Sequence, residues 1–158
     1  MNKKNDYLIK LQSEMIFAAR KRNFKDMSEI YNEIEYIKYN KHTTTRIFFS
    51  ELDENFSVRL PYRFKELRNK DKVDALIYPH SNLLEIYYTP LDLINWQKDF
   101  IKNDVGACYE KINVISDDVI FIGEEILHTL EWYVNDIMMI EVSNSIIISK
   151  FEPGNWFF

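Results

Sequence analysis

The stretch IMMIEVSNSIIISKF, residues 137–151, decides the fold class of this chain. Two runs of mostly apolar β-forming residues flank Asn144 and Ser145, a pattern typical of two strands joined by a tight turn. Similar runs, broken by turn residues, recur upstream at intervals of roughly ten residues, which predicts an antiparallel meander. These upstream runs are 112–115, 119–122 and 126–134, and the breaks are Ser116-Asp117, Gly123-Glu124 and Asn135-Asp136.

The run 126–134 fits two kinds of element. Its Thr, Trp, Tyr and Val content favours a strand. Within 124–134, one face of a helix also fits, so the periodicity leaves the helix open; that face is formed by Ile126, Leu127, Leu130, Tyr133 and Val134. We therefore expect a strand here, with a helix as the alternative.

The first forty residues have helical periodicity instead. Apolar side chains predict one helix over about residues 5–22 and a second through Met27 to Ile37. The short Arg22-Asn23-Phe24 link between them predicts an antiparallel helical hairpin. The face of the first helix is formed by Tyr7, Leu8, Leu11, Met15, Ala18 and Ala19.

The middle of the chain predicts two β-hairpins and one more helix. β-formers in 43–49 and 56–60 flank Asp53-Glu54-Asn55, and those in 75–88 flank the turn residues 79–82. Thr89-Pro90-Leu91-Asp92 is a helix start, which predicts a helix near residues 90–102. The sequence thus predicts a single α+β domain over 1–158, in which an N-terminal helical hairpin packs on a mainly antiparallel sheet.

The composition indicates a globular protein of a reducing compartment. The chain is 46% hydrophobic and 28% charged, close to the average for folded domains. Cys108 is the single cysteine, so no disulfide forms within the chain. No uninterrupted apolar run approaches the roughly 18 residues of a membrane span. We therefore expect a cytoplasmic protein without membrane contact.

Motifs for phosphate, dinucleotide and metal binding are missing from the sequence. Gly106, Gly123 and Gly154 stand alone, and phosphate-binding loops need clustered glycines. Cys108 and the three histidines are too widely spaced for a paired zinc motif. The sequence predicts no cofactor, no metal and no catalytic residue.

One catalytic alternative stays open at this level. Cys108 could act as a nucleophile activated by His128, with Asp136 or Asn135 orienting the imidazole. A lone cysteine is more commonly a small buried apolar residue, so a binding role is favoured over an enzymatic one.

Charge is distributed unevenly along the chain. The net charge is −5, yet residues 1–50 hold ten Lys/Arg and six Asp/Glu, whereas residues 103–158 hold two and ten. Such an acidic segment repels a polyanion and attracts a basic protein. We expect a basic protein partner and no nucleic acid.

The candidate partner-binding residues combine carboxylates in predicted turns with two adjacent aromatic rings. An acidic surface with exposed rings suits the binding of Arg/Lys-rich proteins. The alternatives are that the carboxylates are simply solvated and that one ring fills the core while the other shields a sheet edge. The candidates are Asp117, Asp118, Glu124, Glu125, Glu131, Trp132, Tyr133 and Asp136.

These features favour a protein-binding inhibitor of the immunity-protein or antitoxin kind, which neutralises a basic partner such as a nucleic-acid-directed toxin. The first alternative is an enzyme with a site assembled from scattered His, Cys and carboxylates. The second is an oligomeric structural or adaptor protein built on the helical hairpin. The terminal rings Trp156, Phe157 and Phe158 pack internally or at an interface, and a homo-oligomer is left open.

Overall fold

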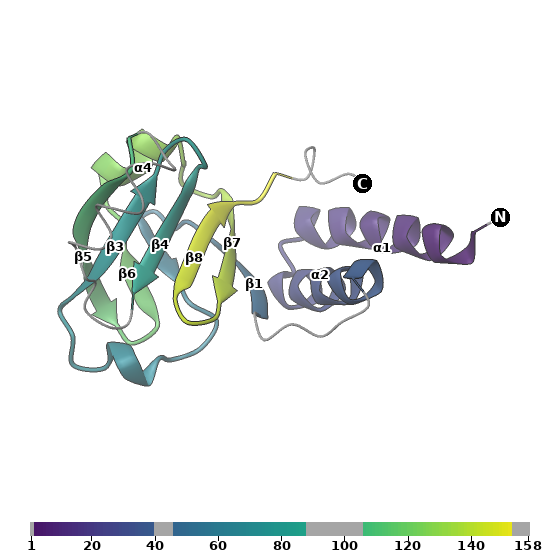
Figure 1. Ribbon diagram of the computed structural model, residues 1–158, viewed down its shortest axis with the longest axis horizontal. Coiled ribbons are helices and arrows are strands. Elements are labelled where there is room, and N and C mark those ends of the chain that lie inside the picture. Colours follow the sequence, from purple (N-terminus) through teal and green to yellow (C-terminus); the bar gives the residue numbers. More distant parts are fainter. Residues whose placement is uncertain (1, 40–45, 88–105, 153–158) are drawn as a thin grey trace.

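The computed structural model describes residues 2–39, 46–87 and 106–152. Within these ranges the chain is an α+β protein whose N-terminal helical hairpin packs on an eight-stranded antiparallel sheet, as the sequence predicts (Figure 1). The helix expected near residues 90–102 and the terminal rings lie outside the described residues. The helices are α1 (Lys3–Arg20), α2 (Phe24–Tyr39) and α4 (Glu124–Leu130), with one 3-10 turn, η1 (Lys65–Leu67). The strands are β1 (Arg46–Glu51), β2 (Ser57–Arg59), β3 (Lys72–Tyr78), β4 (Leu83–Tyr87), β5 (Cys108–Ser116), β6 (Val119–Phe121), β7 (Ile137–Val142) and β8 (Ile146–Lys150).

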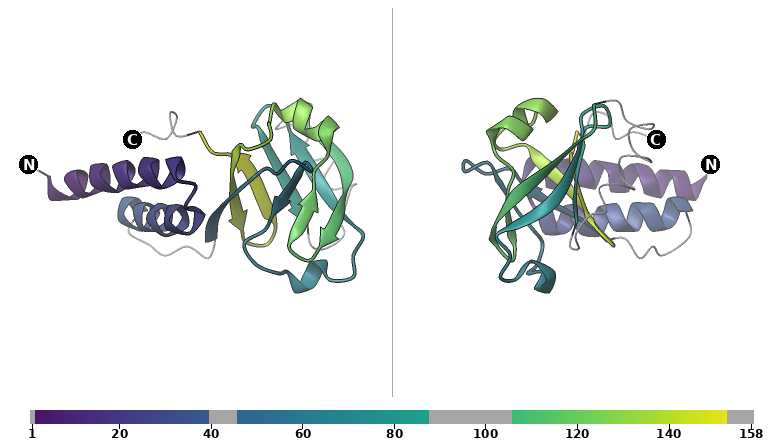
Figure 2. Two further views of the ribbon diagram at one scale, coloured as in Figure 1. Left: turned by 180° about the vertical axis from the view of Figure 1, so that it is seen from behind. Right: turned by 60° about the vertical axis from the view of Figure 1, so that its left-hand side comes forward.

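Helix α2 runs along β1, where Ser28 and Asn32 donate to the Ile47 carbonyl, and the apolar core between the hairpin and the sheet lies near the hairpin's turn. There Met15, Ala18 and Met27 pack against Phe49 of β1 and Phe151 after β8. Farther out, Leu8, Leu11 and Ile34 form a separate cluster between the two helices. The hairpin therefore projects from the β1 side of the sheet (Figure 2).

The sheet curls until its two edge strands meet. Its strand order is β1-β7-β8-β4-β3-β5-β6-β2, and all pairs are antiparallel. The edge strands β1 and β2 are consecutive in the chain and touch through a bridge between Leu52 and Val58. The main core lies inside this curl, where Leu84, Ile86, Ile120 and others are fully buried.

The expected hairpins are confirmed in two of three places. β3 and β4 pair through the turn at 79–82, with Tyr78 opposite Leu83, and β7 pairs with β8. The chain does turn at 53–56, but β1 pairs mainly with β7 and β2 with β6. Because one face of β1 also packs on the helical hairpin, its apolar pattern reflects two neighbours rather than a simple ladder with β2.

The prediction of a strand in 126–134 is wrong, and with it the prediction of an unbroken meander. Residues Glu124–Leu130 form α4, which separates β6 from β7. Ile126, Leu127 and Leu130 bury one helical face. Of the β-formers that favoured a strand, Thr129 lies within the helix, and Trp132, Tyr133 and Val134 lie beyond its end. The helix stops at Glu131, whose left-handed backbone (φ 58°) a helix cannot continue.

Among the described residues, no helix is both long enough and apolar enough to cross a membrane.

Candidate functional site

A groove of about 550 Å³ runs between α4 and the start of β5. Its floor is apolar and includes Ile77 of β3 and Ile126 of α4, both at most 5% exposed. A smaller depression of about 340 Å³ shares its border residues and extends toward Phe121 and Ile122. Three carboxylates, those of Glu110, Glu124 and Glu125, border both hollows.

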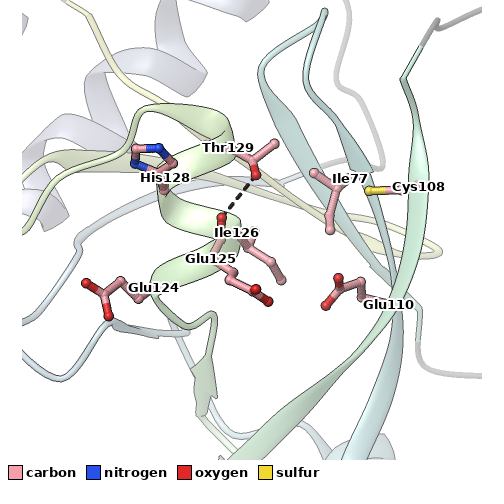
Figure 3. A pocket seen from close by; sticks show the side chains of 8 residues that line it. All are labelled: Ile77, Cys108, Glu110, Glu124, Glu125, Ile126, His128 and Thr129. Atoms are coloured by element: carbon pink, nitrogen blue, oxygen red, sulfur yellow. Dashed lines mark hydrogen bonds between the residues drawn. The ribbon is translucent and has the colours of Figure 1, made fainter.

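The carboxylates of the groove come from two elements that the fold brings together. Glu110 lies on β5, and Glu124 and Glu125 form the first turn of α4. In Figure 3 the carboxylates of Glu110 and Glu125 face each other across the groove, while Glu124 points to the outer side of the helix. Within the described ranges, none of the three carboxylates accepts a hydrogen bond or forms an ion pair.

The wall formed by α4 is held in place by the β3–β4 turn. The Asn82 side chain donates to the Leu130 carbonyl (2.7 Å), and its oxygen accepts from Nε1 of Trp132 (2.7 Å). These bonds connect the end of α4 to the sheet. The wall is therefore fixed by a buried ring and by a turn distant in sequence.

Trp132, a predicted binding residue, belongs to this support rather than to the surface. It is 2% exposed and packs in the main core, whereas its neighbour Tyr133 is 66% exposed. This arrangement matches the alternative in which one ring fills the core. Tyr133 lies under the Lys150 ammonium, which is 5.3 Å from the ring centroid.

The structure separates the other predicted carboxylates from the groove. Asp117 and Asp118 lie in the β5–β6 turn, where Arg63 and Arg59 approach them at 3.8 and 2.9 Å. A hydrogen bond from Ser116, followed by the charge of Arg59, lowers the pKa of Asp118, although burial opposes the change. Each of these two acids therefore has an arginine partner within the chain.

Glu131 and Asp136 lie in the loop between α4 and β7. Asp136 accepts from the Tyr133 amide (2.7 Å) and pairs with Lys150 (3.2 Å). The same ammonium donates to the Glu131 carbonyl (2.9 Å). Lys150 thus fastens this loop, and only Glu124 and Glu125 of the predicted set border the groove.

Sequence reasoning missed the residues that complete the groove with them. Glu110 follows β-forming Tyr109 within an acidic third of the chain, but its position opposite α4 depends on strand pairing that the sequence does not reveal. Ile77 and Ile126 read as ordinary core positions.

Cys108 and His128 border the same groove, which bears on the catalytic alternative. Burial, and secondarily Glu110, raise the pKa of the Cys108 thiol, which keeps it in the less nucleophilic neutral form. In Figure 3 the thiol lies beside Ile77 while the His128 ring points to the opposite side of α4. The proposed orienter Asp136 is engaged with Lys150, so the four residues do not form a relay here.

Metal binding has no support in the described ranges 2–39, 46–87 and 106–152. No three His, Cys, Asp or Glu side chains there come close enough to hold an ion. A small hard cation therefore lacks a ligand set in the groove.

No protein-family model matches the chain, and a search of curated proteins gave no match.

Proposed function

We propose that this chain is a protein-binding inhibitor, of the immunity-protein or antitoxin kind, that neutralises a basic protein partner through its acidic surface. The observation that supports this proposal best is the groove between α4 and β5, whose opposed carboxylates form no ion pair within the described residues. Two like charges on facing walls repel each other, and a partner's Lys or Arg relieves that repulsion.

The physical basis is competition for a cationic surface. A nucleic-acid-directed protein carries Lys and Arg where phosphates bind, and carboxylates placed against them occupy the same donors. Uncompensated carboxylates also speed the encounter by long-range attraction.

Affinity capture from a lysate of the source cell tests the proposal. The full-length chain is immobilised beside a Glu110→Gln/Glu125→Gln variant, and bound proteins are identified by mass spectrometry. A Glu29→Gln/Glu54→Gln variant is the matched control, because it removes the same charge from two exposed positions outside the groove. We expect a basic protein that the native chain and the control retain and the groove variant loses.

The captured protein must also lose its own activity when the native chain is added, as an inhibitor requires. Recovery of an acidic protein, equal retention by all three chains, or an unchanged activity of the captured protein contradicts the proposal.

A further inference from the structure

We infer that two copies of this chain pair face to face through one side of the helical hairpin. This side, the hairpin face, surrounds a hollow of about 520 Å³ between α1 and α2. The hairpin lies at the end of the molecule opposite α4, so the inference is independent of the proposed function (Figure 1). The residues around the hollow include Lys10, Glu14, Phe17 and Lys21 of α1 and Asp26 and Ile30 of α2.

Away from the sheet, the hairpin buries few apolar side chains. Within the described ranges, its outer cluster contains Leu8, Leu11 and Ile34, with Ile30 and Ile37 partly buried, and it includes no residue of a strand. Most helical stability in proteins comes from the packing of an apolar face against another element. A second hairpin laid on the first supplies such an element and completes a four-helix arrangement.

Two aromatic rings are exposed on the hairpin face. Phe17 borders the hollow and is 58% exposed, with the Lys21 ammonium 4.3 Å from its ring centroid. Tyr7 is 42% exposed, and its hydroxyl donates to Glu33 of α2, so the ring lies on the same side of the hairpin. Large rings that lose their water contact are the usual anchors of protein interfaces. In the pair, each Phe17 packs on the α2 helix of the second copy beside Ile30.

The opposite charges of the two helices select a second copy as the occupant. Helix α1 carries four basic and two acidic residues, whereas α2 carries two basic and four acidic ones. A two-fold axis along the hairpin places α1 of each chain over α2 of the other. Both halves of the interface then join a basic helix to an acidic one. A partner with one sign of charge would match only one of the two helices.

The charges on the hairpin face follow the same division. Lys10 and Lys21 project from α1, whereas Asp26 and Glu33 project from α2. Lys10 forms a long pair with Glu14 (4.0 Å) on its own helix. Within the described residues, Lys21, Asp26 and Glu33 form no ion pair, and both carboxylates accept hydrogen bonds from neutral side chains. These three charges are therefore available to the second copy.

The area of the hairpin face suits a weak but specific dimer. Helices of 18 and 16 residues are about 27 and about 24 Å long, and two of them side by side are about 20 Å wide. Covering this face on both chains buries roughly 1,000 Å² in total, the lower end of the range for specific interfaces. We therefore expect a Kd in the micromolar range.

Sedimentation velocity of the full-length chain tests the inference without any ligand. We expect a reversible monomer–dimer equilibrium. Phe17→Ala should raise the dimer Kd by about tenfold or more, because it removes the central ring of the interface. Tyr133→Ala removes an equally exposed ring outside the hairpin and should leave the Kd unchanged. Thermal unfolding of the dilute chains verifies that both variants are folded.

Paired charge reversals give a result that a folding defect does not mimic. Lys10→Glu/Lys21→Glu makes both helices of the face acidic, and Asp26→Lys/Glu33→Lys makes both basic. We expect each variant alone to sediment as a monomer, because like charges meet across the two-fold axis. An equimolar mixture should form a heterodimer, because every contact again joins opposite charges.

Three outcomes overturn the inference: a native chain that stays monomeric at millimolar concentration, an unchanged Kd for Phe17→Ala, or a mixture of the charge variants that does not associate. The inhibitor function is tested separately, because the charge variants leave the α4–β5 groove intact. If they are monomeric and still capture the basic protein, the inhibitor function does not depend on the dimer. A dimer without any captured basic protein contradicts the inhibitor function alone.

Discussion

The two ends of β5 carry acidic residues of opposite character. At the turn into β6, Asp117 and Asp118 are met by Arg63 and Arg59, and Ser116 donates to Asp118 at 2.7 Å. Near the start of the strand, Glu110 faces α4 without an ion pair within the described ranges. The carboxylates of the turn form ion pairs that connect two loops, whereas the carboxylates of the groove form no ion pair within the described ranges. A net charge counted along the sequence does not distinguish these two situations.

The difference arises from the chain's path rather than from composition. The end of β2 and the segment after it bring Arg59 and Arg63 to the turn. There the Leu60 and Phe64 amides also donate to the carbonyls of Asp118 and Asp117 (2.7 and 2.8 Å). At the other end, α4 approaches β5 with its own first turn, which is acidic. The helix dipole favours carboxylates near a helix N-terminus. Glu124 and Glu125 can therefore stay charged without a neighbouring cation.

We expect the largest loss of stability when Trp132, the buried ring that anchors the end of α4, is removed. Trp132→Ala should lower the free energy of unfolding by about 3–5 kcal/mol, because it opens a cavity in the core and leaves Asn82 without its indole donor. Tyr133→Ala, at an exposed ring, should change it by less than about 1 kcal/mol. Urea denaturation measures both. Similar losses in the two variants would mean that α4 is not anchored through Trp132.

The next effect isolates the turn that holds α4. Asn82→Gly keeps the left-handed backbone (φ 54°) accessible while it removes both side-chain hydrogen bonds. We expect a loss of about 1–3 kcal/mol in urea denaturation, with faster amide hydrogen exchange in α4 than in β3. Uniform acceleration in both elements would show that Asn82 stabilises the sheet rather than the groove wall.

A smaller effect separates paired from unpaired acids by pH. Asp118 has a lowered pKa, so its contribution to stability is present above the unfolded pKa and is lost as the pH falls through the folded one. Asp118→Asn should therefore destabilise the protein at pH 7 and make little difference once the native carboxylate is protonated. Thermal unfolding between pH 2 and pH 7 measures this, because the pKa of an unperturbed aspartate is about 4.

Glu141 on β7 should show the opposite dependence of stability on pH, because its pKa is raised rather than lowered. Burial, and then the charge of Glu35 on α2, raise its pKa. Its contribution to stability is fully present below the unfolded pKa and is lost as the pH rises through the folded one. Glu141→Gln should raise the melting temperature at pH 7 and lose this advantage in acid. Parallel profiles for the Asp118 and Glu141 variants would contradict both assignments.

The fold can be predicted from the sequence wherever one periodicity of apolar residues, helical or strand-like, dominates a segment. The helical hairpin, the β3–β4 turn and the β7–β8 turn follow from local patterns and turn residues. The error in 126–134 arose because Trp132 and Tyr133 raised the β-propensity of a window whose helix ends before them. A backbone reversal at Glu131, a residue without special preference for φ > 0, leaves little local signal.

Only part of the candidate site can be predicted from the sequence. Glu124 and Glu125 stood out as a pair after Gly123, but Glu110 becomes their neighbour only through the pairing of β5 with β3 and the packing of α4. Likewise, Asp117 and Asp118 looked available because Arg59 and Arg63 lie more than fifty residues earlier in the sequence. Contacts between distant segments decide which carboxylates form ion pairs. The periodicity of a single sequence does not reveal these contacts.

Association kinetics distinguish whether the groove or the β5–β6 turn attracts the basic partner. The on-rate of the captured partner is measured between about 0.01 and 0.1 M salt, where the Debye length falls from about 30 to about 10 Å. We compare the native chain, the Glu110→Gln/Glu125→Gln variant and Asp117→Asn. The account predicts a steep salt dependence for the native chain and for Asp117→Asn, and a clearly shallower one for the groove variant. A groove variant with the native slope, or a shallower slope for Asp117→Asn alone, would contradict it.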